Sequence, residues 1–98
     1  MSLQSDLIAA KALIDTPEKW IRGTWERDGC YCAAGALRAA LNFPSMANGR
    51  VDWDFWRHPA VATLDGMTPN GIAQFNDDPD TTHADVMDLF DRAIKAAS

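Results

Sequence analysis

The sequence has few cysteines, few basic residues and no long hydrophobic run. Its 98 residues include two cysteines, too few for the disulfide framework that stabilises many small secreted proteins. No stretch approaches the roughly 18 consecutive apolar residues of a membrane-spanning helix, and the N-terminus lacks the charged and apolar regions of a signal peptide. We therefore expect a cytoplasmic protein that does not bind a membrane.

Basic residues are outnumbered, with 9 Lys and Arg against 14 Asp and Glu, which gives a formal net charge of −5. Direct nucleic-acid binding requires clustered Lys and Arg, so we do not expect it. From Asp65 to Asp91 the chain has seven acidic residues and no Lys or Arg. Such a segment attracts basic surfaces; the alternative is a solvated face that keeps a small protein soluble.

The length of 98 residues suits one domain over residues 1–98, and a hydrophobic content of 47% predicts a folded core. The apolar spacing predicts a mainly α-helical fold of four to six short helices, with or without one short β-hairpin around residues 22–32. Asp28-Gly29 is a typical hairpin turn, and it would join strands 22–27 and 30–32.

Helix-capping residues and prolines divide the rest of the chain. The expected helices span residues 3–15, 33–41 and 82–97, with one helix on each side of Pro59 within residues 51–64. Thr16-Pro17 ends the first helix and predicts a short helical turn, and Thr68-Pro69 predicts a further short helix that runs to about Asn76. In the helix over residues 33–41, Gly35 lies among alanines, which predicts a close approach by a neighbouring backbone.

Three fragments occur together in a pattern that resembles a known family. They are Trp20 with Gly23, the run Cys32-Ala33-Ala34-Gly35-Ala36-Leu37, and Phe75-Asn76-Asp77 before a final helix. The pattern is similar to that of a family of small uncharacterised bacterial and phage domains, and the resemblance covers roughly residues 7–93. The resemblance implies that this chain shares the family's fold and motif positions. It implies no particular activity.

One candidate site is catalytic. A helix that begins after Cys32 would stabilise the Cys32 thiolate, His83 could serve as its base, and Asp77 could orient the histidine. These residue types occur in cysteine-dependent hydrolases and acyl transferases. The structural alternative is a buried, unreactive thiol packed in an alanine-rich helix.

Metal sites have weaker support in the sequence. Cys30, Cys32, His58 and His83 lack the paired spacing of a zinc site. The alternating Asn76, Asp78 and Asp80 lack the glycine and the final Glu of a calcium loop. We therefore expect no metal and no cofactor. Asn76 and Asp77 are better explained as turn residues that tie their loop to the helix beginning at Cys32.

The second candidate site is a protein-binding surface. Four tryptophans cannot all be fully buried in so small a core, and Trp25 or Trp53 is expected at a partner surface, where tryptophan is enriched. The alternative is that the tryptophans border the core, with their N–H groups at its rim. Asn76, Asp77, Asp78 and Asp80 complete this predicted surface.

These observations favour a small acidic protein-interaction module with a basic protein partner, of the kind found in phage- or mobile-element-type inhibitors. One alternative is a small cysteine-dependent hydrolase or acyl transferase that uses Cys32 and His83. The other is a nucleic-acid mimic that occupies the basic groove of a nuclease or DNA-binding protein.

Overall fold

A computed structural model describes residues 2–43 and 53–97, and most of this part of the chain is helical. The elements in chain order are α1 (Leu3–Ala12), η1 (Pro17–Lys19), β1 (Glu26–Arg27), β2 (Cys30–Tyr31), α2 (Ala33–Ala40), α3 (Trp53–Arg57), α4 (Pro59–Gly66), α5 (Ile72–Asp77) and α6 (His83–Ala96). The prediction of a mainly helical domain with one short hairpin is confirmed. Val51 and Asp52, included in the prediction before Pro59, lie outside the described residues.

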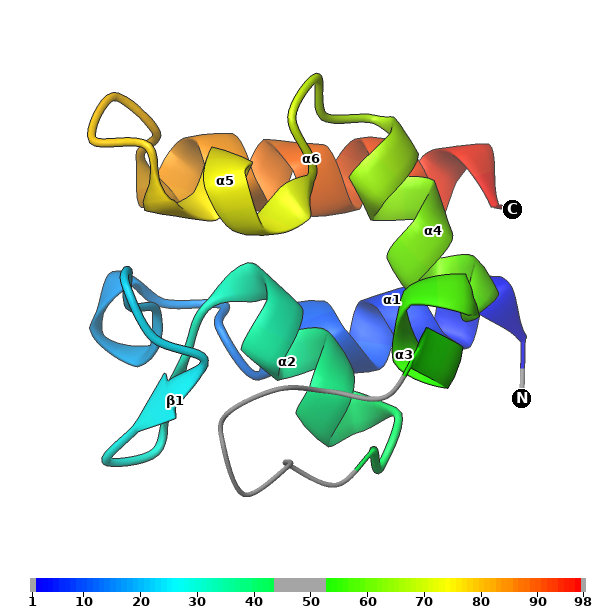
Figure 1. Ribbon diagram of the computed structural model, residues 1–98, viewed down its shortest axis with the longest axis horizontal. Coiled ribbons are helices and arrows are strands. Elements are labelled where there is room, and N and C mark those ends of the chain that lie inside the picture. The colour runs from blue at the N-terminus through cyan, green and yellow to red at the C-terminus, as the bar shows by residue number, and fades with distance from the viewer. Residues whose placement is uncertain (1, 44–52, 98) are drawn as a thin grey trace.

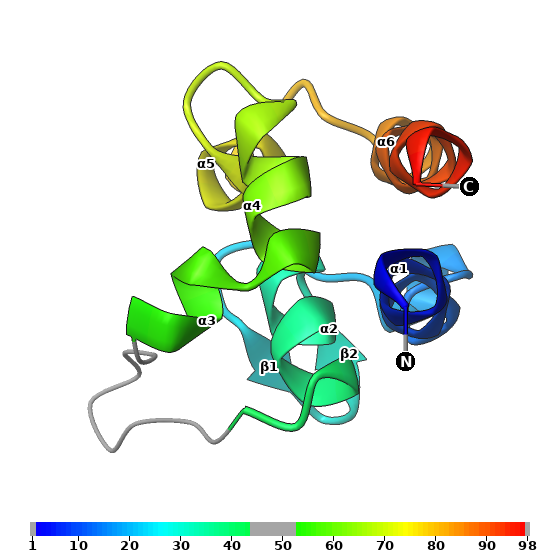
Figure 2. The same cartoon turned by 90° about the vertical axis from the view of Figure 1, so that its right-hand side faces the viewer.

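The helices form two layers. In Figure 1, α1 and α6 run in opposite directions across the molecule, and Figure 2 shows them end-on and side by side. The second layer contains α2, α4 and α5, and α3 flanks it. The chain ends lie at the right of Figure 1, whereas the hairpin and the loop between α5 and α6 lie at the left.

The core lies between these layers and is built from the apolar stripes of the helices. Its largest fully buried apolar side chains are Leu7, Ile14, Leu37, Phe55, Val61, Leu64, Ile72, Val86, Leu89 and Phe90. In α2 the residues from Ala33 to Leu37 are all buried, so the first part of this alanine-rich helix is enclosed. Small side chains there allow other segments to come close to its backbone.

Hydrogen bonds at the helix ends explain where α6 begins and where α1 ends. The Thr82 hydroxyl accepts from the N–H of Asp85 at 3.1 Å, and the Asp85 carboxylate accepts from the N–H of Thr82 at 2.9 Å, so the two residues form a capping box at the start of α6. The first helix was predicted to reach residue 15, but α1 ends at Ala12. The N–H groups of Leu13 and Ile14 donate to carbonyls only three residues back, which tightens and ends the helix.

The predicted start of α5 at Thr68-Pro69 is wrong. The Thr68 hydroxyl donates back to the carbonyls of Leu64 and Asp65, so it closes α4 and does not cap a new helix. The helix instead begins at Ile72, whose N–H donates to the Asp65 carboxylate at 2.9 Å. A carboxylate seven residues earlier in the chain takes the place of a local cap.

The hairpin is confirmed but is shorter than predicted. Glu26 pairs with Tyr31 and Arg27 with Cys30 in antiparallel register. Asp28 and Gly29 form the turn with φ of 53° and 82°, the left-handed conformation that a two-residue hairpin turn of this type requires.

Candidate functional site

Asn76 is the centre of a buried polar network at the end of α5. Its Oδ1 accepts from Nε1 of Trp20 at 2.6 Å and from the backbone N–H of Ala33 at 2.9 Å. Its Nδ2 donates to the carbonyl of Ile21 and to Oδ1 of Asp77, both at 3.1 Å. The amide thus uses its full hydrogen-bonding capacity while being 0% exposed.

This geometry confirms that Asn76 ties its segment to the helix that follows Cys32. It also corrects the assignment of Asn76 to a partner-binding surface, because a fully buried side chain cannot contact a partner in this fold. A polar residue at the end of a short helix is usually exposed, and here it is not. The sequence does not show that Trp20, Ile21 and Ala33 surround it.

Asp77 extends the network to the Trp-x-x-Gly segment. Its Oδ1 also accepts from the backbone N–H of Gly23 at 2.9 Å, and Gly23 has a φ of 82°, a conformation that favours glycine. The fragments that carry the family resemblance therefore meet at one place. We call Trp20, Gly23, Ala33, Asn76 and Asp77 the motif junction.

Cys32 caps the N-terminus of α2 with its sulfur atom. Its Sγ accepts from the N–H of Gly35 at 3.2 Å, and the side chain is 5% exposed. Burial raises the pKa of the Cys32 thiol above its ordinary value of 9.0, the N–H groups of Gly35 and Ala34 oppose that rise, and the nearby charge of Asp77 adds to it. The thiol is thus held in its protonated, less nucleophilic form.

His83 makes structural contacts with another part of the chain. Its Nε2 lies 2.7 Å from the carbonyl oxygen of Ile14, and a carbonyl only accepts, so Nε2 carries a hydrogen. The His83 ring also packs against the Trp20 ring, with centroids 6.0 Å apart. His83 thus joins the start of α6 to the segment after α1, whereas the sulfur of Cys32 caps its own helix. These contacts are not the nucleophile–base hydrogen bond of the predicted catalytic pair.

The last residue of α5 and the loop that follows it present three exposed acidic residues, Asp77, Asp78 and Asp80. Within it, Oδ1 of Asp78 accepts from the N–H of Asp80 at 2.9 Å, and the carbonyl of Asp78 accepts from the N–H of Thr81 at 3.0 Å. The side chain of Thr81 is buried. We call residues 77–81 the acidic loop, and these bonds fix its conformation.

One basic residue from the first half of the chain lies beside the acidic loop. The guanidinium of Arg22 donates to the carbonyl of Thr81 and stacks on the Trp20 ring, 4.7 Å from its centroid. The sequence shows no Lys or Arg between Asp65 and Asp91, but the fold brings Arg22 to this region. The charge on the loop is therefore partly offset at one end.

Two shallow hollows adjoin on the outer side of α5, each of about 280 Å³. One is lined by Gln74, Asp77, Asp78 and Pro79, and the other by Pro69, Asn70, Gln74, Phe75, Asp78 and Thr81. Because Gln74 and Asp78 line both, the two hollows form a continuous surface. It combines carboxylates with the half-buried ring of Phe75.

Trp25 belongs to an aromatic cluster at the edge of the core. Its ring packs against Phe55 at 5.5 Å and against Trp56 at 5.9 Å between centroids, and it is half-buried. This placement agrees with the alternative in which tryptophans border the core. The side chain of Trp53, the other tryptophan assigned to a partner surface, lies outside the described residues.

Some expectations concern metals and membranes. Across residues 2–43 and 53–97, no three His, Cys, Asp or Glu side chains gather as metal ligands. No helix in that same part of the chain combines the length and apolar character needed to cross a membrane.

Three contacts had no signal in the sequence. Asp65 caps α5, Arg22 reaches the acidic loop, and His58 approaches Asp6 across the interface between α1 and α4. Asp65 lies seven residues before its partner Ile72, and the other two pairs are more than fifty residues apart in sequence. Local patterns cannot predict such tertiary contacts.

Comparison with known protein families identifies one family that covers nearly the whole chain. Residues 1–96 match the family of unknown function DUF6197. No curated protein and no solved structure matches the chain. The match spans every element of the fold, including the motif junction, and the chain therefore belongs to DUF6197, a family of unknown function.

Proposed function

We propose that this protein is a small interaction module whose acidic loop binds a basic surface on a partner protein. The observation that carries the proposal is the joint exposure of the Asp77, Asp78 and Asp80 carboxylates on one fixed loop. Such a loop attracts a basic partner and orients it during encounter.

The rigidity of the loop supports a binding role. The turn between Asp78 and Asp80 holds its tip, the bond from Gly23 to Asp77 holds its start, and Arg22 holds Thr81 at its end. A surface that is already ordered loses less conformational entropy on binding than a flexible one does. The motif junction would then serve to hold the binding loop in place.

The adjoining hollows supply contact area beside the charges. A basic side chain could lie over Asp77 and Asp78 with its methylene groups against Pro79, while a neighbouring apolar side chain contacts Phe75. Apolar contacts of this kind provide binding energy that charge pairs alone rarely supply.

The test compares partner capture by two doubly substituted variants. Asp78→Asn with Asp80→Asn removes two charges from the acidic loop and keeps an oxygen on residue 78 for the turn. Asp88→Asn with Asp91→Asn removes two exposed charges from α6, where they pair with Arg92 and Lys11. Asp77 is left unchanged, because its carboxylate holds Gly23 and Asn76.

We expect the acidic-loop variant to lose partners that both the wild-type protein and the α6 variant retain at the same salt concentration. Thermal melting of all three proteins checks that each is folded. Equal capture by a folded acidic-loop variant contradicts the proposal.

A more specific form of this proposal is an inhibitor of the phage or mobile-element type that covers a basic groove. Such a partner would bind nucleic acid through the same groove, so duplex DNA should displace the protein from it. If duplex DNA does not separate the protein from a captured partner, the protein binds some other basic surface on that partner.

A further inference from the structure

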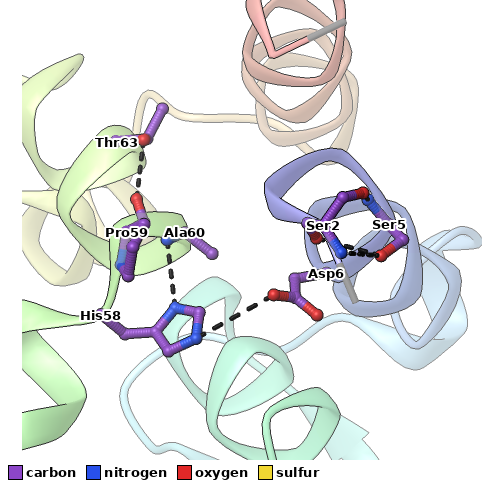
Figure 3. Close-up of polar contacts among 7 residues, drawn as sticks. All are labelled: Ser2, Ser5, Asp6, His58, Pro59, Ala60 and Thr63. Carbon is purple, nitrogen blue, oxygen red and sulfur yellow. Dashed lines mark hydrogen bonds and ion pairs between the residues drawn. The ribbon is translucent and has the colours of Figure 1, made fainter.

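His58 joins the start of α4 to α1 through both of its ring nitrogens. Its Nδ1 accepts from the N–H of Ala60 at 3.1 Å, which makes His58 the N-cap of α4 (Figure 3). Its Nε2 lies 4.0 Å from Oδ2 of Asp6 on α1. The His58 and Asp6 side chains are 27% and 15% exposed.

The cap determines which nitrogen carries the proton. A nitrogen that accepts a hydrogen bond has no proton of its own, so in the neutral ring the hydrogen is on Nε2, facing Asp6. Pro59 has no N–H, and the ring therefore satisfies the first N–H that α4 possesses, that of Ala60.

Protonation of the ring is incompatible with this cap. A proton added at Nδ1 occupies the lone pair that Ala60 uses, so the hydrogen bond is lost and both nitrogens become donors. The same proton gives the ring a positive charge within 4.0 Å of the Asp6 carboxylate. We propose that His58 is a proton-operated cap, which in its neutral form holds α4 and in its protonated form exchanges this bond for an ion pair with Asp6 of α1.

The surroundings leave Asp6 available for this pairing. The hydroxyls of Ser2 and Ser5 bond to backbone atoms of the same helix end, and Figure 3 shows the Asp6 carboxylate directed toward His58. Among the described residues, Asp6 supplies the only carboxylate oxygen within 4.0 Å of the ring nitrogens.

Other charged or titratable side chains on elements that contact α4 are Lys11 of α1, Arg38 of α2, Asp54 and Arg57 of α3, Asp77 of α5, and His83, Asp85, Asp88, Asp91, Arg92 and Lys95 of α6. Lys11 pairs with Asp91, and Arg38 donates to the carbonyl of Phe43, whose ring lies edge-on to His58 with centroids 6.2 Å apart.

The proposal is tested by NMR on the full chain at pH 8 and pH 5, on either side of the usual histidine range. At pH 8 the nitrogen shifts of His58 should show hydrogen on Nε2 and a bare Nδ1. At pH 5 the chemical shift of the Ala60 amide should change. Its protection factor, the intrinsic exchange rate at that pH divided by the measured rate, should be about five- to tenfold lower than at pH 8, as expected when one N-cap is lost. Both changes should follow the titration of the His58 ring and not that of His83.

The matched variant is His58→Asn, because asparagine caps helices well and does not titrate. The chemical shift and the protection factor of its Ala60 amide should not change between pH 8 and pH 5. A response of Ala60 that persists in the variant, or that follows His83 in the wild type, overturns the proposal. If the variant does not fold, the NMR measurement on the wild-type protein still tests the proposal. A hydrogen on Nδ1 of His58 at pH 8 would also overturn it.

Discussion

The carbonyl oxygen of Trp25 lies 1.8 Å from the position that a Cβ atom of Gly35 would occupy. The same oxygen accepts a hydrogen bond from the N–H of Cys32 at 3.3 Å. The backbone just before β1 therefore packs directly against the first turn of α2. Glycine is the only residue that permits this contact without movement of the backbone. The close approach predicted from an isolated glycine among alanines is confirmed.

Replacement of Gly35 should therefore destabilise the protein. Gly35→Ala places a methyl group on a backbone oxygen, and we expect a loss of at least about 1–3 kcal/mol in the free energy of unfolding. Gly35→Leu should cost more. Gly66→Ala is the matched control: Gly66 lies at the end of α4, and a Cβ there meets no atom within 4 Å. Denaturant unfolding measures the three values, and an unchanged midpoint for Gly35→Ala would contradict the prediction.

Removal of the Asn76 amide should have a larger effect. Asn76→Ala leaves the Trp20 and Ala33 donors and the Ile21 carbonyl without this partner, and each buried unpaired group costs about 1–3 kcal/mol. We expect several kcal/mol in total, measured by chemical denaturation. Gln74→Ala, on the exposed side of the same helix, should change stability by less than about 0.5 kcal/mol. Equal effects of the two substitutions would contradict the role of Asn76.

Features that depend on neighbouring residues were predictable from the sequence. The capping box of α6, the turn at Asp28-Gly29 and the division of two helices at Pro59 follow from local backbone chemistry. Each requires only residues within a few positions of one another. The start of α5 was predicted wrongly, because Thr68 bonds backward and Asp65 supplies the cap.

The candidate site was less predictable. Asn76 and Asp77 were recognised as turn residues, but the burial of Asn76 depends on Trp20 and Ala33, which are 56 and 43 residues away. Whether the charges of the acidic loop bind a partner depends on a surface that the chain itself does not contain. Sequence and fold together determine where those charges lie and how rigidly they are held.

The two cysteines should differ in reactivity. Cys32 is buried and its pKa is raised by burial, whereas Cys30 is half-buried and donates to the carbonyl of Glu18. We expect a thiol reagent to label Cys30 first and Cys32 only as the protein unfolds. Mass spectrometry of partly labelled protein identifies the site. Rapid labelling of Cys32 near pH 6 that is lost in His83→Ala would contradict this prediction and support the catalytic alternative.

Stability should also fall at alkaline pH because of Cys32. A thiol whose pKa is higher in the folded state than the ordinary 9.0 retains its proton better when folded. Its contribution is therefore fully present below about pH 9 and decreases as the pH rises toward the folded-state value. Cys32→Ser keeps a capping oxygen and does not titrate, so its stability should decline less between pH 8.5 and 10.5. Equal declines in the two proteins would contradict this assignment.

Association with a basic partner should depend on salt mainly through its rate. The acidic loop acts over the screening length, about 10 Å at 0.1 M salt, so added salt should slow encounter more than it speeds dissociation. Removal of the charges at Asp78 and Asp80 should lower the association rate at low salt and reduce its salt dependence. Surface-plasmon measurements on a captured partner separate the two rate constants. Asp88→Asn with Asp91→Asn controls for net charge, since it removes the same charge from a face whose acidic groups already pair with Arg92 and Lys11. If both variants slow association equally, net charge directs the encounter, and the acidic loop has no special part in it.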